Sequence, residues 1–197
     1  MEKNYFRKKL HHYNTPGHCH FLTFSCYHRF SHFNDPVACR LFLEELEQSR
    51  KIYCFKLWAY VIMPNHVHLL IWPLHKSYQI NRIESGIKGI MAKRYRKVLC
   101  DNSLSTPDNF LIKDQKGKHF IFWQKGGGFD RNLWESQIIH NTIKYIEENP
   151  VRLRLVKSAD EWEWSSAYAR KHNKGLIPDI FAMPVKLSNP QSKTIFL

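Results

Sequence analysis

The sequence predicts an α+β fold in which an antiparallel sheet has helices packed on one face. Within the first 72 residues, three short runs rich in aromatic and β-branched residues are typical of strands, at 20–27, 55–63 and 66–72. One helical pattern separates the first two runs, and the order strand, helix, strand, turn, strand places that helix across the sheet. The chain has 197 residues, 43% of them hydrophobic, which is enough for one folded domain.

The first helix is expected to begin at Asp35-Pro36, because aspartate caps helix N-termini and proline is favoured at the first helical position. Apolar residues then recur at the spacing of one buried face, and glutamates stay outside it. The apolar positions are Cys39, Phe42, Leu43 and Leu46, and the glutamates are Glu44, Glu45 and Glu47. The pattern predicts a helix that packs on the sheet.

The two central strands are joined by Pro64-Asn65, a pair typical of tight turns, and two histidines follow at once. Because side chains alternate along a strand, His66 and His68 point to the same face and Val67 to the other. Two imidazoles that converge on one point are candidate metal ligands. The alternative is that they are core or edge residues with satisfied hydrogen bonds.

Residues 77–99 are predicted to form a second helix, whose apolar stripe contains Ile80, Ile83, Ile87, Ile90, Met91 and Val98. Between positions 76 and 100 the helix is strongly basic, with Glu84 as its one acid. This imbalance favours a phosphate-contacting surface over a merely solvated face. The candidate contacts are Arg82, Lys88, Lys93, Arg94, Arg96 and Lys97. Tyr95 lies among them, either to stack on a base or to pack.

Residues 100–117 are rich in turn formers and predict a loop insertion. A short strand is predicted at 119–123, and Gly126–Gly128 predict a flexible joint.

A third helix is predicted at 132–148, and Asn149-Pro150 ends it because the residue before proline is pushed out of the helical region. Tyr145 and Asn149 are four residues apart and therefore face the same way. The stretch that follows alternates basic and apolar residues, and it adds Arg152 and Arg154 to the candidate phosphate contacts.

Lysine and arginine outnumber acids by 30 to 17, a net charge of +13 that favours polyanionic partners. No run approaches the roughly 18 apolar residues of a membrane span, so no membrane partner and a cytoplasmic location are expected. The five cysteines form no C-x-x-C pair, which argues against a disulfide framework or a zinc ribbon.

These parts suggest phosphodiester cleavage. Two neutral imidazoles and one oxygen ligand make an open site for a divalent metal, and a tyrosine hydroxyl four residues from an amide is a candidate nucleophile. The metal would act as a Lewis acid on the scissile phosphate. The chain contains nine tyrosines, and spacing alone does not decide which of them meets the histidines.

Two long motifs carry a resemblance to a known family. Tyr60-Val-Ile-Met-Pro-Asn-His-Val-His-Leu-Leu70 resembles the signature of the single-tyrosine HUH transposases. Tyr145-Ile-Glu-Glu-Asn-Pro-Val-Arg-Leu-Arg-Leu-Val156 is similar to the catalytic helix of their REP-associated branch, as are the elements Trp164-Ser-Ser166, Phe122-Trp-Gln124 and Phe129-Asp-Arg131. The resemblance covers about residues 20 to 170, whereas the 100–117 insertion and the triple glycine have no fixed counterpart.

The resemblance implies a ferredoxin-like sandwich, with His66 and His68 binding Mg²⁺ or Mn²⁺, Tyr145 as the nucleophile and Asn149 completing the metal site. It implies cleavage and rejoining of hairpin-bearing single-stranded DNA through a 5′-phosphotyrosine link, by a monomer or a homodimer that exchanges the tyrosine helix. The expected organisation is a basic arm (1–19), an HUH domain (20–170) and a C-terminal tail (171–197).

Two other interpretations stay open. The same fold would suit a non-catalytic single-stranded nucleic-acid binder. A structural zinc protein would use the N-terminal group that includes His18, Cys19 and His20. The sequence does not indicate which hairpin or cleavage site is recognised, or whether the protein would move its own gene or only repeated elements.

Overall fold

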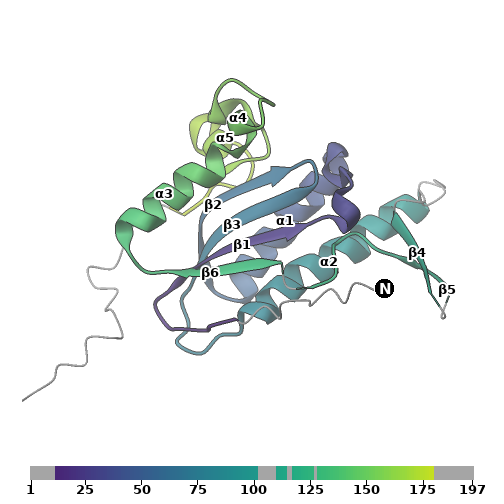
Figure 1. The fold of residues 1–197 in the computed structure, drawn as a ribbon, viewed down its shortest axis with the longest axis horizontal. Coiled ribbons are helices and arrows are strands. Elements are labelled where there is room, and N and C mark those ends of the chain that lie inside the picture. The colour runs from purple at the N-terminus through teal and green to yellow at the C-terminus, as the bar shows by residue number, and fades with distance from the viewer. Residues whose placement is uncertain (1–11, 102–109, 115–116, 127, 180–197) are drawn as a thin grey trace, which may run out of the picture.

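The computed structural model describes residues 12–101, 110–114, 117–126 and 128–179. Four antiparallel strands form the main sheet in the order β2-β3-β1-β6, and the connections give the ferredoxin-like arrangement (Figure 1). The strands are β1 (Cys19–Ser25), β2 (Phe55–Met63), β3 (His66–Pro73) and β6 (Phe129–Leu133). The two helices of the repeat are α1 (Pro36–Ile52) and α2 (Ile80–Asp101). The predicted fold class is confirmed.

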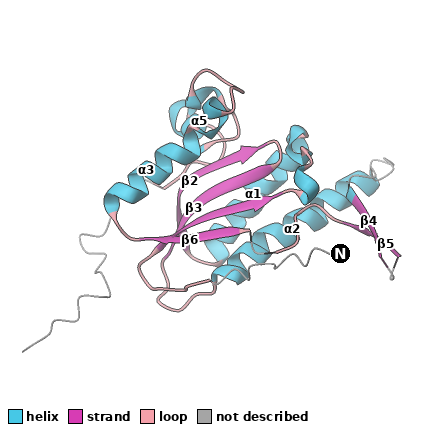
Figure 2. Cartoon of the chain, in the orientation of Figure 1, coloured by secondary structure: helices cyan, strands magenta, loops and turns pink. Residues whose placement is uncertain are grey.

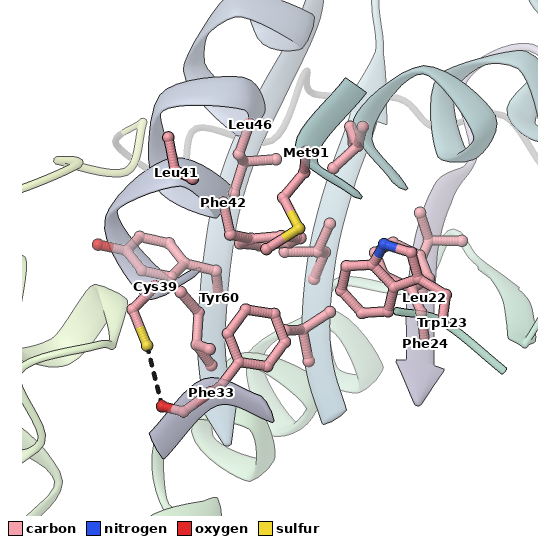
Figure 3. Packing of buried hydrophobic residues seen from close by; sticks show 14 of the residues in the cluster. Leu22, Phe24, Phe33, Cys39, Leu41, Phe42, Leu46, Tyr60, Met91 and Trp123 are labelled. Atoms are coloured by element: carbon pink, nitrogen blue, oxygen red, sulfur yellow. Dashed lines mark hydrogen bonds between the residues drawn. The ribbon is translucent and has the colours of Figure 1, made fainter. Parts of the chain in front are cut away.

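The main core lies between the sheet and helices α1 and α2 (Figure 3). Phe24 of β1, Phe42 of α1 and Met91 of α2 are fully buried there. Each such side chain contributes about 1.5–3 kcal/mol by leaving water. The start of α1 is capped as predicted, since the Asp35 carboxylate accepts a 2.8 Å hydrogen bond from the Val37 amide. This layer holds the sheet from one side.

The apolar stripe predicted for α2 is only partly correct. Ile80, Ile83, Ile87 and Met91 are buried against the core, but Ile90 is 44% exposed. Tyr95 packs inward, where its hydroxyl donates a 2.7 Å hydrogen bond to Asp35 Oδ2. Of the two alternatives for this tyrosine, packing is the one that the structure shows, because the ring is buried.

Three further α-helices follow β6 in the part of the chain that the structure describes: α3 (Ser136–Glu147), α4 (Asn149–Arg152) and α5 (Ser166–His172). Helix α3 lies on the sheet face opposite α1 and α2, where Ile139 and Ile146 pack with Val61 and Leu70 in a second core (Figures 1 and 2). The one-face prediction thus holds for α1 and α2 only. The sheet is covered on both sides.

Strand β6 is absent from the prediction, which wrongly began a helix at residue 132. The segment Phe-Asp-Arg-Asn-Leu lacks the alternation of a half-buried strand, because as an edge strand it keeps polar residues on both faces. Its partner is β1, with Phe129 opposite Thr23 and Leu133 opposite Cys19. Only this pairing makes the segment a strand.

The predicted loop insertion at 100–117 was wrong at both of its ends. Helix α2 continues to Asp101, and β4 (Leu111–Asp114) and β5 (Gly117–Phe120) form a separate antiparallel hairpin. Residues 102–109 and 115–116 lie outside the described part of the chain. The strand predicted at 119–123 corresponds to β5, which begins earlier in the chain and is shorter than predicted.

The glycine segment before β6 is a point of close packing at Gly128. This residue has a φ of +76°, and a Cβ atom added to it would lie 2.2 Å from the Thr23 carbonyl oxygen. Only glycine fits such an approach. Gly126 accepts a 3.1 Å hydrogen bond from Lys88 Nζ through its carbonyl, and residue 127 lies outside the described residues. The segment is therefore tied to the sheet and α2 on both sides of residue 127.

The chain ends that are described pack on the domain. Residue His12 and the buried His20 both donate through Nδ1 to the Asp130 carboxylate, at 2.7 Å each. At the other end, Asp179 Oδ2 accepts a 2.9 Å hydrogen bond from the Leu57 amide in β2. Residues 1–11 and 180–197, which make up most of the predicted arm and tail, lie outside the described residues. No helix among the described residues is long and apolar enough to cross a bilayer.

We expect the buried His32 to lower the free energy of unfolding in mild acid. The ring is 4% exposed, stacks on Phe110 at 3.9 Å and has no hydrogen-bond partner among the described residues. Burial lowers its pKa from 6.5 to about 4. Between these values the unfolded chain binds a proton that the folded chain does not, so stability is lost as pH falls, by about 1.4 kcal/mol per pH unit.

Urea unfolding at pH 7.5 and pH 5.0 tests this expectation. The His32→Phe variant should lose roughly 2 kcal/mol less stability than the wild type over that range. Equal losses in the two proteins would show that His32 does not contribute.

Candidate active site

His66 and His68 lie side by side on the sheet face that α3 covers. They occupy the first and third positions of β3, directly after the Pro64-Asn65 turn, and their ring centroids are 4.8 Å apart. His68 is 6% exposed, and its cross-strand partners are Val61 on β2 and Thr23 on β1. The alternation of the strand therefore brings two imidazoles together on a rigid support.

Both rings are held through the same nitrogen. His68 Nδ1 is 2.7 Å from Thr23 Oγ1, and His66 Nδ1 is 2.6 Å from Asn65 Oδ1. Among the described residues, neither Nε2 atom has a hydrogen-bond partner. Such partners fix the orientation of metal-binding histidines in proteins. The two Nε2 atoms are thus the available donors of the pair.

Both histidines are neutral near pH 7. Burial lowers the pKa of His68 to about 3, with a smaller effect of the neighbouring His66. Burial also lowers the pKa of His66 to about 4, and Arg29 adds to this effect. A neutral imidazole is the form that binds a metal, so the pair is ready to accept one at physiological pH.

Tyr145 reaches this pair from α3 in the same chain. Its ring centroid is 5.8 Å from that of His68, and the side chain is 36% exposed. The guanidinium of Arg152, on α4, lies 4.9 Å from the centre of the Tyr145 ring. Glu148 forms a 3.6 Å ion pair with Arg152. The tyrosine is therefore accessible and has a positive charge beside it.

Asn149 follows one turn after Tyr145, at the start of α4, and is 7% exposed. Glu147, two residues before it, accepts hydrogen bonds from Ser166 and Arg170 of α5. Because its carboxylate is occupied in holding α5, Glu147 is not placed to act on Tyr145. Asn149 stays a predicted oxygen ligand for the metal.

The basic residues of α2 are not brought to the histidines, because α2 packs on the opposite face of the sheet. Two of them are occupied in the protein: Lys88 bonds to Gly126, and Arg94 bonds to Glu44 and Glu45 at 2.5 Å each. The others on this helix are exposed, namely Arg82, Lys93, Arg96 and Lys97. Of the predicted phosphate contacts, Arg152 is the one that lies beside Tyr145, and Arg154 is exposed two residues after it.

Sequence reasoning did not identify Thr23, which holds His68, or Phe21, whose ring lies 5.5 Å from His68 and 5.9 Å from Tyr145. The period of two in the first strand places both on one face and was the available signal.

The N-terminal zinc interpretation finds no support in the described residues, where no three His, Cys, Asp or Glu side chains could hold a metal. His18 stacks on Trp134 with ring centroids 5.0 Å apart, and His20 bonds to Asp130 and Tyr78. Cys19 is buried in the second core, and burial raises the pKa of its thiol.

A family model that matches this sequence shows to which family the protein belongs. A family model described as "Transposase IS200 like" matches residues 15–149, about two thirds of the chain. The protein belongs to the IS200-like transposase family. The matched segment includes both histidines, Tyr145 and Asn149, and it spans the whole four-stranded sheet. No curated protein matches the sequence.

The fold of this IS200-like transposase is similar to that of a REP-associated tyrosine transposase solved bound to a REP hairpin. The TM-score is 0.63 at 18% identity, over 91% of this chain and 94% of that one. A putative transposase from Deinococcus radiodurans R1 has a TM-score of 0.43 at 21% identity, over 73% of this chain and 97% of that one. The first likeness supports the fold assignment.

Proposed function

We propose that this protein cleaves and rejoins hairpin-bearing single-stranded DNA with a divalent metal and a tyrosine nucleophile. The observation that carries the proposal is the position of Tyr145, whose ring lies 5.8 Å from His68 within one chain. An accessible tyrosine beside two neutral imidazoles combines a nucleophile with metal ligands. We assign the protein to the REP-associated branch on its motifs, and the fold likeness is consistent with that assignment.

His66, His68 and Asn149 would hold Mg²⁺ or Mn²⁺, since two neutral Nε2 donors and an amide oxygen suit such an ion and leave positions open. When bound, the metal supplies Lewis-acid stabilisation of the charge that develops on the phosphate. The proposed roles of Thr23 and Asn65 are to hold the orientation of the two rings through their Nδ1 atoms.

Tyr145 Oη attacks phosphorus. The new Oη–P bond forms as the P–O3′ bond breaks, so the products are a 5′-phosphotyrosine and a free 3′-hydroxyl. The phenol proton passes to solvent and the leaving oxygen takes up a proton. Arg152, above the tyrosine ring, offers positive charge where the phosphate must approach. A second 3′-hydroxyl reverses the step and rejoins the strand without a nucleotide cofactor.

The DNA substrate would bind where the surface carries exposed positive charge. Exposed arginines and lysines of α2, together with Arg154, are proposed to contact phosphates away from the reacting centre, whereas Arg152 is proposed to contact the phosphate beside Tyr145. Because Tyr145 and His68 meet in one chain, a monomer would suffice, and a homodimer that exchanges α3 is the alternative. The proposed arm (1–19), domain (20–170) and tail (171–197) follow the predicted boundaries.

The test uses a labelled hairpin oligonucleotide with single-stranded flanks, incubated with the protein and Mg²⁺ or Mn²⁺. We expect a covalent adduct that survives denaturation, carries the 5′ phosphate and requires the metal. If the oligonucleotide binds equally well in a chelator and no product forms at any metal concentration, the protein is a non-catalytic binder and the proposal fails.

A further inference from the structure

The edge strand β6 presents two exposed side chains of complementary chemistry on the face of the candidate active site. Phe129 is opposite Thr23, and Arg131 is opposite Phe21, in the pairing of β6 with β1. Residues that pair across strands share a face of the sheet. Thr23 bonds to His68, so Phe129 and Arg131 lie on the same face as the histidines.

An aromatic chain connects this strand to the reacting groups. The ring of Phe129 lies 5.6 Å from that of Phe21, and Phe21 in turn lies 5.5 Å from His68 and 5.9 Å from Tyr145. Phe129 is 47% exposed although it is a large apolar residue, and Arg131 is also exposed. An aromatic ring and a cation two residues apart, with the single ring of Phe21 between Phe129 and the nucleophile, are placed to bind a nucleotide.

The strand is held firmly by contacts on both of its faces. On its other face Asp130 bonds to His12 and His20, and Asn132 donates a 2.7 Å hydrogen bond to the Tyr13 carbonyl. Leu133 is buried in the second core, and the close approach of Gly128 to Thr23 fixes the start of the strand. Phe129 and Arg131 are therefore presented on a rigid support, which lowers the entropy cost of binding.

We propose that β6 binds the single-stranded nucleotide that flanks the cleaved phosphate, with its base stacked on Phe129 and its phosphate on Arg131. Single-strand binding sites combine these two elements, an aromatic ring for a base and a cation for the backbone. This inference rests on the proposed function, and it adds the site that would guide the strand to Tyr145.

The test measures binding in a chelator, so that no cleavage takes place. Fluorescein-labelled oligo(dT) of twelve nucleotides and an abasic strand of equal length are the two probes. Phe129→Ala should weaken oligo(dT) binding about 10-fold and change abasic binding less than about 2-fold. Phe129→Trp, which keeps an aromatic ring, should bind oligo(dT) as the wild type does. Arg131→Gln should weaken both probes equally and reduce the salt slope by about one.

Tyr13→Ala is the matched control, since Tyr13 is 68% exposed and lies at the opposite face of β6, and it should bind both probes like the wild type. A strand carrying 5-iodouracil should also cross-link to the peptide that contains Phe129. Unchanged oligo(dT) binding by Phe129→Ala, no binding by the wild type, or equal loss for both probes would each overturn the inference.

The two proposals fail separately. If the wild type forms no adduct with a hairpin but Phe129→Ala still loses base-dependent binding, the proposed cleavage is wrong and the proposed nucleotide binding by β6 is supported. If the wild type forms the adduct and Phe129→Ala binds and cleaves normally, the binding strand is wrong and the cleavage stands.

Discussion

Replacing Tyr145 with phenylalanine is expected to abolish the covalent protein–DNA adduct and to lower hairpin cleavage roughly 10³-fold or more. The change removes only the hydroxyl, which is the proposed attacking group, and it keeps the ring against Phe21, His68 and the Arg152 guanidinium. The side chain is 36% exposed, so the fold should tolerate the variant. The measurement is adduct yield on a denaturing gel, with the thermal midpoint as the check on folding.

Tyr13→Phe is the control for this experiment, because Tyr13 is exposed and lies away from the histidines. It should form the adduct at the wild-type rate. An adduct that persists in Tyr145→Phe would show that another tyrosine attacks, and peptide mapping of that adduct would identify it.

Replacing His66 with alanine is expected to weaken Mn²⁺ binding at least about 100-fold and to stop cleavage, while hairpin binding is kept. His66 supplies one of two neutral Nε2 donors in the pair, whereas the exposed arginines and lysines that would contact phosphates lie on other elements. Calorimetric titration with Mn²⁺ and a gel-shift assay with the hairpin measure the two effects separately.

His75→Ala is the matched control, since His75 is an exposed histidine beyond the end of β3. It should bind Mn²⁺ and cleave like the wild type. Equal Mn²⁺ affinity in wild type and His66→Ala would remove His66 from the metal site. A chelator should reproduce the loss of cleavage in the wild type, and added Mn²⁺ should reverse it.

Local patterns were enough to predict much of the fold. The bounds predicted for β2 and β3 agree with the structure to within one residue, because both are long, apolar and separated by Pro64-Asn65. The start of α1 was equally well marked by its Asp35-Pro36 cap. The prediction failed for β6 and for the first residues of α3, since an edge strand with polar residues on both faces has no periodic signature.

By itself, the sequence determined that His66 and His68 share a face of one strand, because a period of two is a local property of the backbone. It also determined that Tyr145 and Asn149 lie four residues apart, which the structure places near the end of α3 and at the start of α4. Only the tertiary structure decided that α3 lies over the histidine face and α2 under the other, which brings Tyr145 to His68, with Arg152 beside the tyrosine, and leaves the basic α2 away from the histidines. The reason is that helix placement depends on the pairing of β6 with β1 and on side chains far apart in sequence, which no local pattern records.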